Sequence, residues 1–141
     1  MEYKITIRDF TALGLGLAFI SVGIDHFNSP DWYEPIVPSI LPNPTFWVLA
    51  SGFFDALFGL LFKIPRTRTW ASVSIAWMLV VLYWANFNMW YNDVPFGDQR
   101  LTYGWTGTHA LRCALQVLLL AVLHFLRISY AAAASASSKG D

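Results

Sequence analysis

Residues 108–122, THALRCALQVLLLAV, decide the fold, because this apolar, helix-like run carries His109, Arg112 and Gln116 in its first half. The whole chain of 141 residues is 56% hydrophobic and only 13% charged, whereas an ordinary soluble domain carries about 25% charged residues. A chain with so little polar surface cannot cover itself in water. The composition therefore predicts an integral membrane protein in which polar side chains at 109–116 face other helices.

Three further apolar runs of similar length accompany this one. The four expected spans are 10–27 (FTALGLGLAFISVGIDHF), 44–62 (PTFWVLASGFFDALFGLLF), 69–90 (TWASVSIAWMLVVLYWANFNMW) and 107–126 (GTHALRCALQVLLLAVLHFL). Spans of about 18 to 22 residues, at about 1.5 Å per residue, match a hydrocarbon core about 30 Å thick. A cleaved signal peptide is the alternative for the first run, but GIDHFNSPDWY lacks the small-residue site that cleavage needs.

The expected fold class is all-α, a transmembrane antiparallel four-helix bundle. It forms one domain over residues 10–127, preceded by an N-terminal segment, 1–9, and followed by a tail of small residues, 128–141, that we expect to be disordered. Lysine and arginine flank the bundle unevenly: they are Lys4, Arg8, Lys63, Arg66, Arg68, Arg127 and Lys139 on one side and Arg100 on the other. The positive-inside rule then predicts a multi-pass protein with both termini cytoplasmic.

Strongly polar residues inside the spans fall in the outer half of the expected bundle. The candidate pocket residues are His26, Asp55, Asn86, His109, Arg112 and Gln116. A charge at the bilayer centre costs at least about 2.5–3.5 kcal/mol, so acids and bases in a span usually pair in the bundle interior. We expect Asp55 and Arg112 to form an ion pair, Asn86 and Gln116 to complete its hydrogen bonds, and the two histidines to relay protons. The alternative is an ion pair that only fixes helix register.

Other classes of site are disfavoured by composition. The single cysteine, Cys113, rules out an internal disulfide, a dithiol pair and a cysteine metal cluster, and no metal site is expected. A net charge of zero gives no basic field for nucleic acid. No flavin, haem or iron–sulfur motif is evident, so any electrons must come from a partner protein. Small residues in SGFFDALFG, 51–59, predict close approach of the second helix to a neighbour.

Several short motifs, in order and with sensible spacing, carry a resemblance. They lie in VGIDHFNSPDWYEPIVPSILPNP (22–44), SGFFDALFGLLFKIPRTR (51–68), ANFNM (85–89) and HALRCALQ (109–116). With these motifs the chain resembles the DoxX family of small four-helix membrane proteins. The matching positions are Gly23, His26, Phe27, Tyr33, Ile36, Val37, Pro38, Leu41, Pro42, Ser51, Gly52, Gly59, Pro65, Arg66, Arg68, Ala85, Asn86, Met89, Leu111, Arg112 and Gln116.

Two positions depart from the family pattern, and both touch the pocket. Asp55 stands where the family has glutamate, which shortens the acid by one methylene, and Trp84 stands where the family has proline, which removes an expected kink. The resemblance implies a redox-linked membrane protein, since the name-giving relatives are linked to a thiosulfate:quinone oxidoreductase. It also implies a second possibility, because a distant branch assists receptor assembly.

Three functions therefore remain open at this point. The first is a redox-linked membrane subunit whose pocket binds a quinone as its cofactor. The second is an assembly factor or structural partner without catalytic activity, and the third is a transporter of protons or small molecules. The expected partners are the lipid membrane, a redox subunit or client membrane protein, and a second copy of the chain, with no nucleic acid among them.

Overall fold

The structure, a computed structural model, describes the backbone of residues 6–92 and 105–138, and the side chains of residues 6–92 and 110–136. The long elements of these segments are α1 (Ile7–Asn28), α2 (Pro44–Lys63), α3 (Arg68–Tyr91) and α4 (Trp105–Ser138). Short 3₁₀ turns, η1 (Pro30–Trp32), η2 (Glu34–Ile36) and η3 (Pro65–Thr67), fill the first two connections. No strand occurs within the described segments, which confirms the all-helical prediction.

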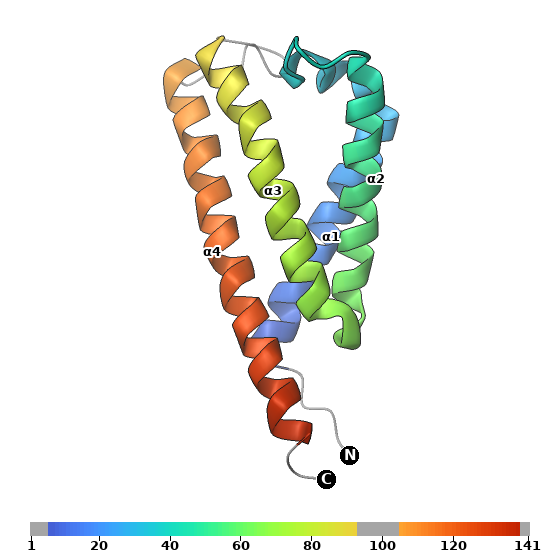
Figure 1. Cartoon of the computed structure of the whole chain (residues 1–141), viewed down its shortest axis with the longest axis vertical. Coiled ribbons are helices and arrows are strands. Elements are labelled where there is room, and N and C mark those ends of the chain that lie inside the picture. The colour runs from blue at the N-terminus through green and yellow to red at the C-terminus, as the bar shows by residue number, and fades with distance from the viewer. Residues whose placement is uncertain (1–5, 93–104, 139–141) are drawn as a thin grey trace.

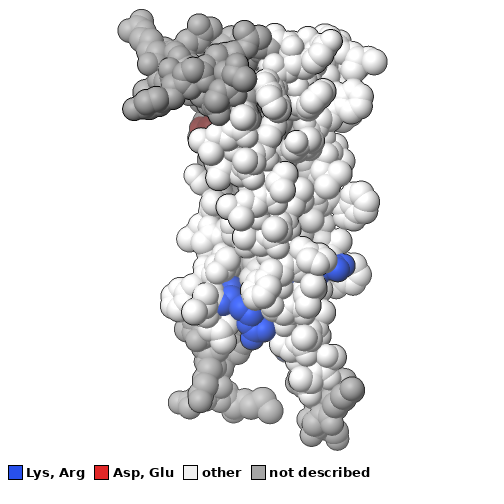
Figure 2. Space-filling view, turned by 90° about the vertical axis from the view of Figure 1, so that its left-hand side faces the viewer, with Lys and Arg blue, Asp and Glu red and all other residues white. Residues whose placement is uncertain are grey.

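All four helices are long and apolar enough to cross a membrane, as the hydropathy of the sequence predicts. The shortest of them, α2, has 20 residues, or about 30 Å at about 1.5 Å per residue. Large apolar side chains cover their outer surfaces, and Val81, Leu118 and Phe125 are 69%, 59% and 62% exposed. Figure 2 shows one such face, which is mostly uncharged and carries lysine and arginine in its lower half and a small acidic patch near its upper end.

Capping residues set the starts of the first two helices. Thr6 and Asp9 form a capping box at the start of α1. Asn43, which has a left-handed backbone with φ of 53°, accepts a hydrogen bond from the Phe46 amide at 3.3 Å, and Pro44 follows at the first helical position. Proline at that position loses no hydrogen bond, because the first turn of a helix has no acceptor for its N–H.

The α4 helix is longer than the sequence predicts. It continues from the expected end of the span near residue 126 to Ser138, and this corrects the expectation of a disordered tail from residue 128. The physical reason is the alanine run at 131–134, because alanine has the highest helix propensity of all residues. The tail therefore extends the helix below the other three, as Figure 1 shows.

Glycines bring α1 and α2 into close contact. A Cβ atom on Gly52 would lie 2.5 Å from the His26 Cβ, and one on Gly59 would lie 2.6 Å from the Gly16 carbonyl oxygen. Neither atom would fit, so the α1 and α2 backbones lie closer together than larger residues would allow. The prediction of close approach at 51–59 is confirmed.

The apolar core lies where all four helices meet, toward the lower end of Figure 1. Its buried members are Ala12, Phe19, Phe62, Ala71, Ile75, Leu79, Leu123 and Leu126. Toward the upper end the α1–α2 pair and the α3–α4 pair diverge, and the short turns η1 and η2 lie above them (Figure 1). Of the two groups of buried polar residues described next, the first lies above this core.

Candidate functional site

Three of the predicted pocket residues form one hydrogen-bonded chain between α3 and α4. Arg112 Nη2 donates to Asn86 Oδ1 at 3.2 Å, and Asn86 Nδ2 donates to Gln116 Oε1 at 2.8 Å. Gln116 Nε2 in turn donates to the Leu79 carbonyl oxygen at 2.7 Å. Arg112 and Gln116 share a helical face, being four residues apart, so the chain joins the two helices without distortion.

Asp55 is buried in the middle of α2 and stands apart from this chain. Asp55 is only 3% exposed, and its side chain makes no hydrogen bond or ion pair with any described residue. The expected ion pair between Asp55 and Arg112 is therefore not formed. The reason is geometric: Asp55 lies between Gly52 and Gly59 on the α2 face that packs against α1, whereas Arg112 is on α4 and bonds to α3.

His26 and Tyr33 lie at the C-terminal end of α1, next to α2. The His26 Nδ1 atom donates to the Val22 carbonyl oxygen at 2.8 Å, which leaves Nε2 as the acceptor of the neutral ring. Tyr33 stacks on this imidazole, with the ring centroids 3.9 Å apart, and its hydroxyl donates to Asp25 Oδ2 at 2.6 Å. Gly52 leaves the space that the His26 side chain occupies.

Tyr33 connects the two halves of the site electrostatically. Burial, the hydrogen bond to Asp25 and the negative charges of Asp25 and Asp55 raise the pKa of the Tyr33 hydroxyl to about 12, against an opposing effect of the Arg112 charge. The phenol is therefore within electrostatic range of Asp55 on α2 and of Arg112 on α4. We call His26, Tyr33, Asp55, Asn86, Arg112 and Gln116 the Asp55 site.

The sequence predicts His109, and not Tyr33, as a pocket residue. Tyr33 matches a position of the DoxX motifs, but that match alone indicates no contact with the pocket. His109 lies on α4, and its side chain is outside the described residues. Within the described residues no three His, Cys, Asp or Glu side chains lie together as metal ligands.

A second buried polar cluster, at the lower end of the molecule, was not predicted. Asp9 and Arg68 are 5% and 3% exposed and form an ion pair between α1 and the start of α3. The Thr6 amide and hydroxyl also donate to Asp9 Oδ2, at 2.7 and 2.6 Å, and Arg68 Nε donates to the Phe62 carbonyl oxygen at 3.0 Å. We call Thr6, Asp9 and Arg68 the Asp9 cluster.

The end of α4 closes over this cluster. The Tyr130 hydroxyl donates to the Arg8 carbonyl oxygen at 2.8 Å, and Arg8 Nη1 donates to the Ser129 carbonyl oxygen at 3.0 Å. The Arg68 guanidinium carbon lies 5.6 Å from the centroid of the Tyr130 ring, within cation–π range. These contacts tie the end of α4 to α1 and to the start of α3 beside the Asp9 cluster.

Comparison with known proteins places most of the chain in one family. Residues 15–127 match the family model described as Domain of unknown function (DUF8561). The chain belongs to this family. The matched segment of DUF8561 contains every residue of the Asp55 site but not Thr6 or Asp9. No curated protein and no solved structure matches the chain.

Proposed function

We propose that this DUF8561 protein is an integral membrane protein, a transmembrane antiparallel four-helix bundle with both termini on the cytoplasmic side. The length and hydropathy of all four helices support insertion. The apolar outer surface also supports it, because side chains such as Val81 and Phe125 would otherwise be exposed to water. Lys63 ends α2 and Arg66 lies in η3, at the lower end of the bundle in Figure 1, and Arg127 follows the core residue Leu126 on α4; these cations support a cytoplasmic orientation of that end.

We propose further that the Asp55 site binds a quinone and that the protein is a redox-linked membrane subunit. The observation that carries this proposal is Asp55 itself, a buried carboxyl group without a hydrogen-bond partner among the described residues. An uncompensated polar group in an apolar interior costs about 1–3 kcal/mol, so its retention favours a role in binding. The resemblance to the DoxX family supports the same interpretation, and we propose that the two families are related.

The side chains of the Asp55 site suit a carbonyl compound that exchanges protons. A bound quinone would accept two electrons and two protons, with the electrons supplied by a partner protein. Arg112 can donate a hydrogen bond to a carbonyl oxygen, since a guanidinium carries five N–H donors. The Asp55 carboxyl can hold and release a proton, and the Nε2 atom of His26 can accept one nearer the surface. The stacked His26 and Tyr33 rings supply a flat wall.

Mass spectrometry of molecules extracted from gently purified protein tests this proposal. We expect a quinone in the wild type, and its loss in Asp55→Asn and in Arg112→Gln. Asp31→Asn and Arg66→Gln are the matched controls, because they make the same chemical changes at exposed positions outside the site. Wild-type protein that contains no quinone after extraction in several detergents, and that gains none when quinone is added, would contradict the proposal.

One observation favours the second candidate function, an assembly factor or structural partner. Trp70, Trp77, Trp84 and Tyr91 recur every seven residues on α3 and are 74%, 68%, 66% and 80% exposed. A period of seven is typical of a helix that packs lengthwise against another helix. We would test this by crosslinking at position 81, which lies on the same face of α3 between Trp77 and Trp84 and is exposed, in the native membrane. A defined partner in the wild type that is lost in Trp77→Leu/Trp84→Leu, while the quinone is retained, would favour this function.

A further inference from the structure

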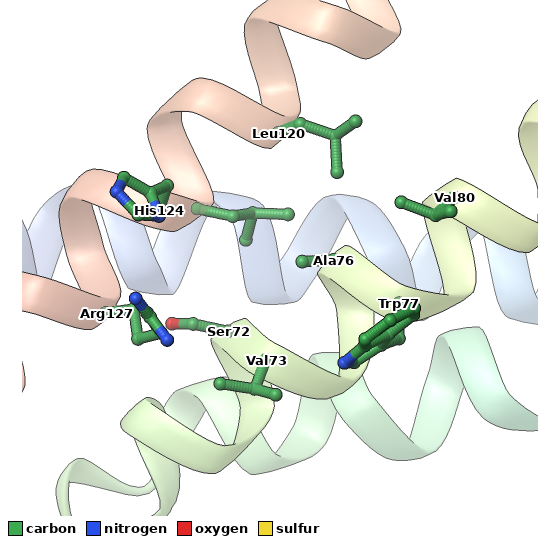
Figure 3. Close-up of a pocket in the computed structure, with 9 residues that line it drawn as sticks. Ser72, Val73, Ala76, Trp77, Val80, Leu120, His124 and Arg127 are labelled. Carbon is green, nitrogen blue, oxygen red and sulfur yellow. The ribbon is translucent and has the colours of Figure 1, made fainter.

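An open groove runs between α3 and α4 on the cytoplasmic half of the molecule, away from the Asp55 site. It has a volume of about 310 Å³, and Figure 3 shows the side chains that line it. Its floor and walls are mainly apolar: Val73, Ala76, Val80, Leu120 and Leu123. Ala76 lies near its middle in Figure 3, where its single methyl group leaves room between larger neighbours. The groove exists because a small residue of α3 faces leucines of α4.

The lower end of the groove carries one cation, Arg127, with His124 beside it. His124 and Arg127 lie three residues apart on α4, so both side chains are on the groove face of the helix, and Figure 3 shows them at one end of it with Ser72. Both are exposed, and neither makes a hydrogen bond or an ion pair with another described residue. Asp9 is the described acidic residue at this end, and Arg68 already neutralises it.

We infer that this groove binds an anionic phospholipid of the cytoplasmic leaflet, with its phosphate on Arg127 and His124 and one acyl chain along Ala76. The inference goes beyond the quinone site and rests on the proposed membrane insertion and orientation. Charge complementarity selects the occupant, since an arginine binds a phosphate through charge-assisted hydrogen bonds. The groove from residue 72 to residue 80 is about 12 Å long at about 1.5 Å per residue, enough for the first part of an acyl chain.

The geometry distinguishes this lipid from other occupants. A free anion would use only the cationic end and would leave the apolar walls uncovered. A helix of another protein would be too large, because a helix about 10 Å across and about 12 Å long encloses about 900 Å³, whereas the groove holds about 310 Å³. A zwitterionic lipid would fill the apolar part, but its choline would bring a positive charge near Arg127.

Native mass spectrometry of the full chain in detergent tests the inference. The probes are phosphatidylglycerol and phosphatidylcholine with identical acyl chains, and glycerol phosphate as a headgroup without chains. We expect phosphatidylglycerol to bind more tightly than phosphatidylcholine. Arg127→Gln should weaken its binding about tenfold, the loss of one charge-assisted contact, and Arg127→Lys should restore most of it. Arg66→Gln is the matched control, an exposed cation at the same end outside the groove.

A second variant tests the apolar part independently. Ala76→Leu should fill the groove and weaken both phospholipids, while Asp55→Asn should leave both unchanged and affect only the quinone. Equal losses in Arg127→Gln and Arg66→Gln would overturn the inference, since they would show general attraction to a basic surface. Binding of glycerol phosphate as tight as that of the lipid would overturn it too, as evidence of an anion site only. Wild-type protein that binds the quinone but neither phospholipid would overturn the lipid inference and leave the proposed quinone site standing.

Discussion

The Asp9 cluster and the Asp55 site each bury an aspartate in an apolar molecule, but the two aspartates differ in their hydrogen-bond and ion-pair partners. Asp9 receives hydrogen bonds from Thr6 and an ion pair from Arg68, so both of its oxygens are occupied. Asp55 is equally buried, and no described residue bonds to it. The contrast indicates that the Asp9 cluster holds the helices together, whereas the carboxyl group of Asp55, unpaired among the described residues, supports the proposed binding role.

The largest expected effect on stability comes from a substitution that breaks the Asp9 cluster. Asp9→Asn leaves the buried Arg68 charge without its counter-ion and should lower the free energy of unfolding by about 3–5 kcal/mol. Unfolding in mixed micelles, followed by circular dichroism, measures the change. Asp31→Asn, at an exposed position, is the control and should change stability by less than about 0.5 kcal/mol.

The same cluster allows a second comparison. The double variant Asp9→Leu/Arg68→Met removes both charges at once, and we expect it to recover most of the loss, because a buried ion pair can often be replaced by apolar groups. A double variant as unstable as Asp9→Asn would show that the hydrogen bonds to Thr6 and Phe62, and not the charges, stabilise this end of the bundle.

An intermediate effect is expected within the Asp55 site. Gln116→Leu removes the acceptor of the Asn86 amide and a donor to the Leu79 carbonyl, and these buried groups should cost about 1–3 kcal/mol of unfolding free energy. Leu115→Ala, at the neighbouring exposed position, is the control in the same assay. A change below about 0.5 kcal/mol in Gln116→Leu would mean that this hydrogen-bonded chain does not join α3 to α4.

The contrast between the two aspartates is sharpest in Asp55→Asn. This variant should unfold with the same free energy as the wild type, or be about 1 kcal/mol more stable, because it removes a buried ionisable group that has no partner. It should also lose the bound quinone. A loss of stability as large as that of Asp9→Asn would show that Asp55 has a structural role, and the proposed function would then lose its main support.

The sequence predicts the fold better than it predicts the pairing of polar residues. Hydropathy and length locate all four helices, and the positions of Asn86, Arg112 and Gln116 in their spans bring them to one level. The predicted pairing of Asp55 with Arg112 is wrong, because the contacts of Gly52 and Gly59 with α1 set the rotation of α2. Depth along a span predicts which residues are level with one another, but it does not predict which helix each one faces.

The Asp9 cluster was missed for a different reason. Asp9 and Arg68 lie at helix starts, where charged residues are usually solvated, and the sequence indicates Arg68 as a flanking cation and a motif position but not as a partner of Asp9. Their burial depends on α4 extending to Ser138 and covering the lower end with Tyr130. A sequence interpretation that ended α4 near residue 126 had no side chain to place there. The capping box Thr6–Asp9 was the one local feature that could have indicated it.

The smallest expected effect concerns Tyr33, which connects Asp55 with the outer surface. Its folded-state pKa of about 12 lies above the unfolded value of about 10, so its contribution to stability is complete below pH 10 and is lost as the pH rises toward 12. A difference titration of tyrosine absorbance between the wild type and Tyr33→Phe should isolate one group with a midpoint near pH 12. In Asp55→Asn this midpoint should move down, because the Asp55 charge is one of its causes. An unchanged midpoint would separate Tyr33 from Asp55 and remove Tyr33 from the proposed site.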